Sequence, residues 1–277
     1  MSSPIPTLFL YDHPASSYAQ KARMALRLKH LPFTKETPAN LGLGEPNSSF
    51  EAANPRMEVP ALIINDGDAE FKIFDSSVIV QYLEDAFPDA PSLLPKDPKE
   101  RAVARMIEEV CDTAYEAINW ALGEVFWFGR AEGAEAERIQ AAAGDQTKQI
   151  HEYLTPLLGT KPFFNGTTPG LADICLAPVF HRSVLRGLGP AKDSPLDAWH
   201  SRMEGVPAIA ETWREMEGGV QGMSNAGPGL WAPHSGRRRE YRDHRLEFLM
   251  KNGAAWIVNK GLEDDNVRFG RWPAVNK

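Results

Sequence analysis

The sequence has little of what marks several special classes of protein. It contains only two cysteines in 277 residues, Cys111 and Cys175, which are far apart and in no metal-binding or redox spacing. No apolar run approaches the ~20 residues of a membrane helix, and the N-terminus lacks a basic segment followed by a hydrophobic stretch. We therefore expect a cytoplasmic protein with reduced cysteines, no disulfide framework, no bound metal and no membrane partner.

Basic charge is also scarce. The chain carries 30 Lys and Arg against 37 Asp and Glu, a formal net charge of −7. Residues 218–277 hold ten basic and six acidic side chains, so the preceding 217 residues are more acidic still. Because nucleic-acid phosphates are bound by clustered cationic side chains, we expect no nucleic-acid partner.

What is present is an ordinary globular composition, 43% hydrophobic and 24% charged, at a length typical of two domains. Strand-like runs alternate with helical patterns over residues 1–87, which predicts an α/β domain. After a linker from Pro88 to Pro98, residues 99–217 show only helical periodicity, which predicts an all-helical domain.

Residues 218–277 form a C-terminal extension. Glycine and proline predict an irregular segment to residue 235, followed by a helix from Arg238 to Lys251 that ends at Gly253. Three tryptophans offer apolar anchors, so we expect the extension to pack on the body. They are Trp231, Trp256 and Trp272.

The first helix is predicted to begin at Ser17, directly after a strand over Thr7 to Tyr11. Its apolar residues recur at helical intervals, with basic residues between them, as in an amphipathic helix. Ser17 and Gln20 fit a capping box, with Ser16 just before it. Both serines can be explained as caps. Alternatively, the free N–H groups of this helix start favour an anion such as a thiolate, to which a serine hydroxyl would donate.

Two other segments suggest a peptide-like ligand. Val59-Pro60 opens a strand-like run, where a cis-proline would leave the preceding backbone groups free to pair with a ligand. Asp75 caps a predicted helix, and the hydroxyl of Ser76 and the N–H groups there could hold a carboxylate. By itself, an Asp cap followed by serines is also common at helix starts.

Taken in order, these segments resemble the cytosolic glutathione transferase family. The resemblance covers about residues 7–217 and is carried by three stretches: Tyr18 to Leu26, Asn54 to Leu62, and Asp75 to Leu83. It implies a thioredoxin-like N-terminal domain, a helical C-terminal domain, glutathione as co-substrate and a homodimer. It resembles the serine-type members most closely, including those of the tau and zeta classes.

The resemblance also implies roles for individual residues. Ser16 would donate to the glutathione thiolate, with Ser17 as the adjacent alternative. Val59 would pair with the cysteinyl backbone and Pro60 would be cis, while Ser76 would hold the γ-glutamyl carboxylate and Asp75 its ammonium group. Many relatives carry Lys or Gln where this chain has Glu58, whose charge would repel the glycine carboxylate unless it turns away or meets an amine.

The resemblance further implies that the second substrate lies against the helix that begins near Lys99. Met106, Val110 and Thr113 recur at about one turn and are the candidates for an apolar wall. Tyr11 is a further candidate near the acceptor, although its position fits a core aromatic better. Asp173, near a helix start in the second domain, is interpreted as structural.

These patterns favour a glutathione transferase whose thiolate attacks a small apolar electrophile. Two alternatives remain open at this point. One is a glutathione-dependent lyase or isomerase, and the other is a non-catalytic binding protein of the same fold.

Overall fold

The computed structural model describes residues 6–39, 41, 47–67, 70–226 and 249–264. A four-stranded sheet lies in the N-terminal part, with strand order β2-β1-β3-β4. Its strands are β1 (Thr7–Tyr11), β2 (Phe33–Glu36), β3 (Ala61–Asn65) and β4 (Glu70–Phe74). β1 is parallel to β2 and antiparallel to β3, which is antiparallel to β4.

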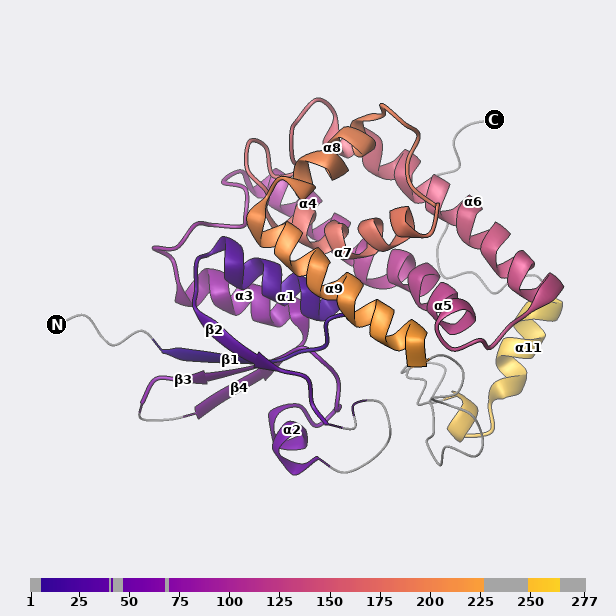
Figure 1. Ribbon diagram of the computed structural model, residues 1–277, viewed down its shortest axis with the longest axis horizontal. Coiled ribbons are helices and arrows are strands. Elements are labelled where there is room, and N and C mark those ends of the chain that lie inside the picture. The colour runs from indigo at the N-terminus through magenta and orange to yellow at the C-terminus, as the bar shows by residue number, and fades with distance from the viewer. Residues whose placement is uncertain (1–5, 40, 42–46, 68–69, 227–248, 265–277) are drawn as a thin grey trace.

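Helices cover both faces of this sheet (Figure 1). α1 (Ser17–Leu28) and α3 (Ser76–Ala86) pack together on one face, and the short α2 (Ser48–Ala53) lies on the other. This is the predicted thioredoxin-like arrangement. The cap of α3 by Asp75 follows from the local sequence signal.

The rest of the described chain is helical. Its elements are α4 (Pro98–Val110), a π-helical turn η1 (Cys111–Tyr115), α5 (Glu116–Phe126), α6 (Gly133–Leu158), α7 (Leu171–Leu185), α8 (Pro195–Glu204), α9 (Pro207–Ala226) and α11 (Ala255–Glu263). The single helix expected over 99–128 is thus interrupted by η1. None of the helices in the described ranges has the length and apolar character needed to span a bilayer.

Helix α1 is more deeply buried than an amphipathic pattern predicts. Lys21, Arg23 and Lys29, which occupy its polar positions, are all at most 2% exposed. The reason is that α7 and α9 cover the polar side of α1, while α3 packs beside it. Each buried cation meets carboxylates, as burial of a charge requires.

The cap of α1 also differs from the prediction. Ser16, with φ −72° and ψ 122°, is the N-cap, and its Oγ accepts a hydrogen bond from Ala19 N at 3.3 Å. Ser17 is therefore already inside the helix. Gln20 lies one residue beyond the position of a capping-box partner, and its buried amide has no partner among the described residues.

Asp173 has the structural role predicted for it. Its buried carboxylate accepts from the backbone N–H groups of Phe164, Asn165 and Gly170 and from Trp199 Nε1, at 2.8–3.2 Å. Glycine at position 170 follows from the same packing, because a Cβ there would lie 2.4 Å from Asn165 Cγ. Cys111 and Cys175 are buried free thiols, as expected.

The described part of the C-terminal extension agrees with the prediction at one position and differs from it at others. α9 continues as a helix to Ala226, although an irregular segment was expected from residue 218. Gly253 does end a helical segment, with φ 71° and a bond from Ala254 N to Leu249 O. Trp256 on α11 is 65% exposed and so does not anchor the extension in this chain. Trp231, Trp272 and most of the predicted helix from Arg238 lie outside the described residues.

Candidate functional site

Strand register brings three separate loops to one edge of the sheet. Tyr11 at the end of β1 pairs with Ala61 at the start of β3, and Ala61 pairs with Phe74 at the end of β4. The segments beyond these residues are the loop from Asp12 to Ser16, the Val59–Pro60 pair, and Asp75–Ser76. We call them together the three-loop edge, and the first of them the Ser16 loop.

The start of α1 offers several hydrogen-bond donors at this edge. Ser16 is half-buried, and because its Oγ accepts from Ala19 N, its hydroxyl hydrogen stays available to a ligand. Within the described structure, the backbone N–H groups of Ser17 and Tyr18 have no acceptor. A hydroxyl and two N–H groups at a helix N-terminus suit an anion.

Ser17 is occupied by other partners. Its buried hydroxyl donates to Glu116 Oε2 at 2.6 Å and accepts from an Nη atom of Arg182 at 2.7 Å. This use of both hydroxyl functions leaves Ser17 no hydrogen for a thiolate. Of the two predicted serines, the geometry therefore favours Ser16.

The Val59–Pro60 peptide bond is cis, as predicted. The N–H and C=O of Val59 have no hydrogen-bond partner in the described part of the chain, so both are available to an extended ligand. Asn54 positions this segment by donating to the Glu58 carbonyl at 2.7 Å. The Glu58 carboxylate pairs with Arg56 at 2.9 Å, which offsets the repulsion expected for a ligand carboxylate.

Asp75 and Ser76 form the third loop. Asp75 has φ 75°, a strained conformation for a residue other than glycine, and its Oδ1 caps α3 by accepting from Ser77 N and Val78 N. Ser76 is 3% exposed, and no described residue bonds its hydroxyl. The Ser76 side chain is therefore able to bind a ligand carboxylate, and the second oxygen of Asp75 an ammonium group.

The structure does not bring the predicted acceptor residues to this edge. Tyr11 lies in a small core, with its ring centroid 4.9 Å from Phe9 and 5.0 Å from Phe50. Met106 and Val110 line an open hollow beside Tyr153 of α6. Thr113 is exposed, and its hydroxyl donates to a backbone carbonyl one turn earlier.

The reason for this difference is the orientation of α4. Glu108 and Asp112 turn toward α1, where they pair with Lys21 at 3.0 and 2.5 Å. Met106 and Val110 each lie two residues before one of these carboxylates, which is about half a turn away on a helix. They therefore face away from the Ser16 loop. Asp112 belongs to this junction through its pairing with Lys21.

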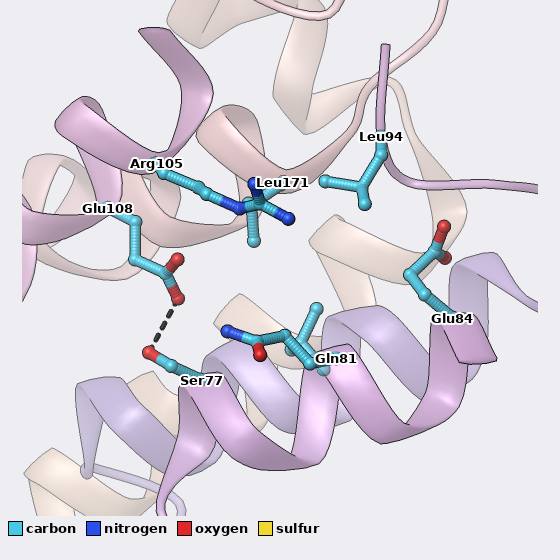
Figure 2. Close-up of a pocket in the computed structure, with 8 residues that line it drawn as sticks. Ser77, Gln81, Glu84, Leu94, Arg105, Glu108 and Leu171 are labelled. Carbon is cyan, nitrogen blue, oxygen red and sulfur yellow. Dashed lines mark hydrogen bonds between the residues drawn. The ribbon is translucent and has the colours of Figure 1, made fainter. Parts of the chain in front are cut away.

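A small polar pocket lies beside this junction, between α3 and α4 (Figure 2). Ser77, Gln81 and Glu84 approach it from α3, and Arg105 and Glu108 from α4. The Ser77 hydroxyl donates to Glu108 Oε1 at 2.6 Å. These contacts join the two halves of the protein, and the pocket is separate from the three-loop edge.

Among the described residues, one group combines side chains that bind metals: His181, His200 and Glu204, with ligand atoms within 4.8 Å of one another. His181 Nδ1 and His200 Nε2 already share a hydrogen bond of 2.9 Å. Both rings also stack on Trp213, at centroid distances of 4.0 and 5.0 Å. We interpret this group as packing between α7, α8 and α9.

Sequence reasoning missed several residues that shape the Ser16 loop. His13 Nδ1 accepts from Ala15 N at 3.2 Å, and burial lowers the His13 pKa, which keeps that nitrogen unprotonated. Glu116 and Arg182 approach from the helical part, more than 95 residues away in sequence. His13 belongs to the same loop as Ser16, whereas no local signal indicates that Glu116 and Arg182 contact this loop.

Comparisons with known proteins agree with this geometry. Residues 10–91, which contain the three-loop edge, match the family model described as "Glutathione S-transferase, N-terminal domain". The chain is 44% identical over 214 residues to glutathione S-transferase Z2 of Arabidopsis thaliana, covering 76% of this chain and 87% of the relative. It is 30% identical over 195 residues to maleylacetoacetate isomerase of Pseudomonas aeruginosa, covering 69% of this chain and 85% of the relative. The solved structure of rice GST1 in complex with glutathione gives a TM-score of 0.63 at 26% identity. The match covers 80% of this chain and 98% of the rice chain.

Proposed function

This chain belongs to the glutathione S-transferase family, as a transferase of that type, and we propose that it activates glutathione at the three-loop edge for attack on a small apolar electrophile. The observation that carries the proposal is the set of unused hydrogen-bonding groups there. The hydroxyl hydrogen of Ser16, the N–H groups of Ser17 and Tyr18, the backbone groups of Val59 and the hydroxyl of Ser76 have no partner among the described residues, and all lie where the strands end.

The spacing of these groups suits a tripeptide. Adjacent strands lie about 4.8 Å apart, so the ends of β1 and β4 are separated by about 10 Å. An extended tripeptide spans roughly the same distance, at about 3.5 Å per residue. In this arrangement the cysteinyl backbone pairs with Val59, and the γ-glutamyl group reaches Ser76 and Asp75.

Ser16 and the start of α1 would then stabilise the thiolate. A free thiol of this kind has a pKa of about 8.5, and each unit of decrease corresponds to about 1.4 kcal/mol. A hydrogen bond to a charged group contributes about 1.5–3 kcal/mol, enough for roughly one to two units. The thiol proton passes to water, the sulfur bonds to the electrophilic carbon, and the leaving group departs with its electron pair.

We place the acceptor beside Trp120 of α5. This residue follows Glu116 by four positions and so lies on nearly the same side of the helix, toward the Ser16 loop. Trp120 is 36% exposed, and an indole ring of this kind packs well against apolar groups.

A glutathione-dependent isomerase is a second candidate, because relatives of this chain in Pseudomonas aeruginosa, Rattus norvegicus and Emericella nidulans are named maleylacetoacetate isomerase. In that reaction the thiolate adds to a carbon–carbon double bond, rotation follows, and elimination returns the thiolate. Glutathione is consumed by the transferase but is regenerated by the isomerase. Measuring glutathione alongside product therefore distinguishes the two.

Two serine variants test the proposed site. Ser16→Ala should lower kcat for conjugation about tenfold or more with little change in the glutathione Kd. Ser76→Ala should instead raise the Kd, because it loses a contact to the peptide and none to the sulfur. Ser201→Ala, on the exposed surface of α8, is the matched control. Equal effects of Ser16→Ala and Ser201→Ala on kcat would refute the role of Ser16.

We further propose that the protein is a homodimer, as the family resemblance implies. Light scattering should give about twice the mass of one chain. A mass equal to one chain over the whole concentration range would contradict this.

A further inference from the structure

Two buried arginines hold the Ser16 loop from opposite sides. Arg23 of α1 donates to the carbonyls of His13 and Pro14, at 3.5 and 3.1 Å. Arg182 of α7 donates through one nitrogen to Ala15 O and to Ser17 Oγ, both at 2.7 Å. The residues on both sides of Ser16 are thus fixed by Arg182, which itself is 3% exposed.

The two arginines differ in how well their charge is neutralised. Arg23 meets Asp12 at 2.5 Å and Glu215 at 3.1 Å. Among the described residues, Arg182 pairs with one carboxylate, that of Glu116, at the longer distance of 3.6 Å. The less compensated positive charge is therefore the one directly beside the start of α1.

A second cation adds to this charge. The guanidinium groups of Arg182 and Arg186 lie 5.4 and 4.8 Å from the ring of Trp127. Burial and the charge of Arg182 lower the pKa of Arg186, as expected for cations held close together. Among the described residues, several ionisable groups lie near the Ser16 loop or Arg182. They are Asp12, His13, Arg23, Lys35, Glu116, Arg186 and Glu215.

We propose that Arg182 is a positioning residue for the reaction: it fixes the backbone beside Ser16 and supplies positive charge that stabilises the glutathione thiolate. This inference rests on the proposed function. Glu116 acts in the opposite direction, because its carboxylate offsets the charge of Arg182 while its bond to Ser17 helps fix the same loop. The two residues therefore share a structural task but have opposite electrostatic effects on the sulfur.

That opposition provides the test. The thiolate absorbance of glutathione bound to the full-length chain is recorded against pH for the wild type, Arg182→Gln, Arg182→Lys and Glu116→Gln. Arg182→Gln should raise the bound thiol pKa by about one unit, a tenfold loss of thiolate below that pKa. Arg182→Lys should retain most of the wild-type value, and Glu116→Gln should lower it. Arg202→Gln, at an exposed position of α8 whose guanidinium donates to Pro162 O, should leave the value unchanged.

Each outcome separates this inference from the function it rests on. A wild-type chain that does not bind glutathione, or binds it with an unshifted thiol pKa, refutes the proposed function itself. A lowered wild-type pKa that Arg182→Gln and Glu116→Gln leave unchanged, or move in the same direction, overturns only the role of Arg182. If Arg182→Gln fails to fold, the double variant Arg182→Gln/Glu116→Gln replaces it, because it removes both buried charges together. The bound thiol should then have a higher pKa in the double variant than in Glu116→Gln. An equal or lower value would contradict the inference.

Discussion

Glu215 on α9 connects the helical part of the protein to α1 and β2, and its replacement by glutamine should be costly in a pH-dependent way. Its carboxylate contacts Arg27 and Lys35 at 2.8 Å and Arg23 at 3.1 Å. Burial raises its pKa, but the hydrogen bonds from Arg27 and Lys35 and the charge of Arg23 outweigh that effect. The net result is a pKa of about 2, against 4.5 for an isolated glutamate.

The size of the effect follows from this difference. A decrease of about 2.5 units corresponds to at most ~3.4 kcal/mol of stability. The side chain is 24% exposed, and solvent screening reduces our expectation to about 2 kcal/mol. Because the folded-state pKa lies below the unfolded-state value, this stability is present above about pH 5 and is lost as the pH falls toward 2.

Urea unfolding at fixed protein concentration measures the effect. Glu215→Gln should lower the unfolding free energy by about 2 kcal/mol at pH 7 and by much less at pH 3. Glu211→Gln is the matched control on the same helix, because the exposed Glu211 contacts only Arg27 among the described residues and should cost at most about 0.5 kcal/mol. Equal losses for Glu215→Gln at both pH values would refute the electrostatic explanation.

Three other predictions test different parts of the structure. Lys21→Met leaves two carboxylates without their buried cation, so it should destabilise the protein by about 3–5 kcal/mol in the same unfolding assay. A loss below ~1 kcal/mol would contradict the stabilising role of this ion pair. Gly219→Val should cost about 1–3 kcal/mol, because even a Cβ there would lie 2.6 Å from Pro14 Cγ; a melting temperature equal to wild type would show that α9 does not press on the loop. Trp120→Ala should raise the KM for an apolar electrophile several-fold while leaving the KM for glutathione unchanged, and a change in the glutathione KM alone would place the acceptor elsewhere.

Local sequence patterns predicted the elements that depend on neighbouring residues. The strand that begins at Ala61, the cap of α3 by Asp75 and the cis bond before Pro60 are all confirmed. Each depends on a few adjacent residues whose preferences agree with the final structure. The α/β character of the N-terminal domain could therefore be predicted from local patterns, whereas its thioredoxin-like fold was implied by the family resemblance.

Features decided by tertiary packing could not be predicted in the same way. The choice between Ser16 and Ser17 depends on Glu116 and Arg182, which approach from distant helices. The burial of α1 depends on α7 and α9. The sequence of α1 alone therefore could not show whether its basic residues are buried or exposed to solvent.

The position of Met106 and Val110 relative to the Ser16 loop could not be predicted for a related reason. Periodicity placed Met106 and Val110 on one face of a helix, but it could not tell which face turns toward α1. The buried pairing of Lys21 with Glu108 and Asp112 decides that orientation. The π-helical turn over Cys111–Tyr115 then shifts Thr113 relative to the regular helical pattern.

A crystal structure of this chain soaked with glutathione tests the central claim most directly. We expect the tripeptide across the three-loop edge, with its sulfur within hydrogen-bond distance of Ser16 Oγ and its cysteinyl backbone paired with Val59. An empty edge at saturating glutathione, or a sulfur atom that lies closer to Ser17 Oγ than to Ser16 Oγ, would contradict it.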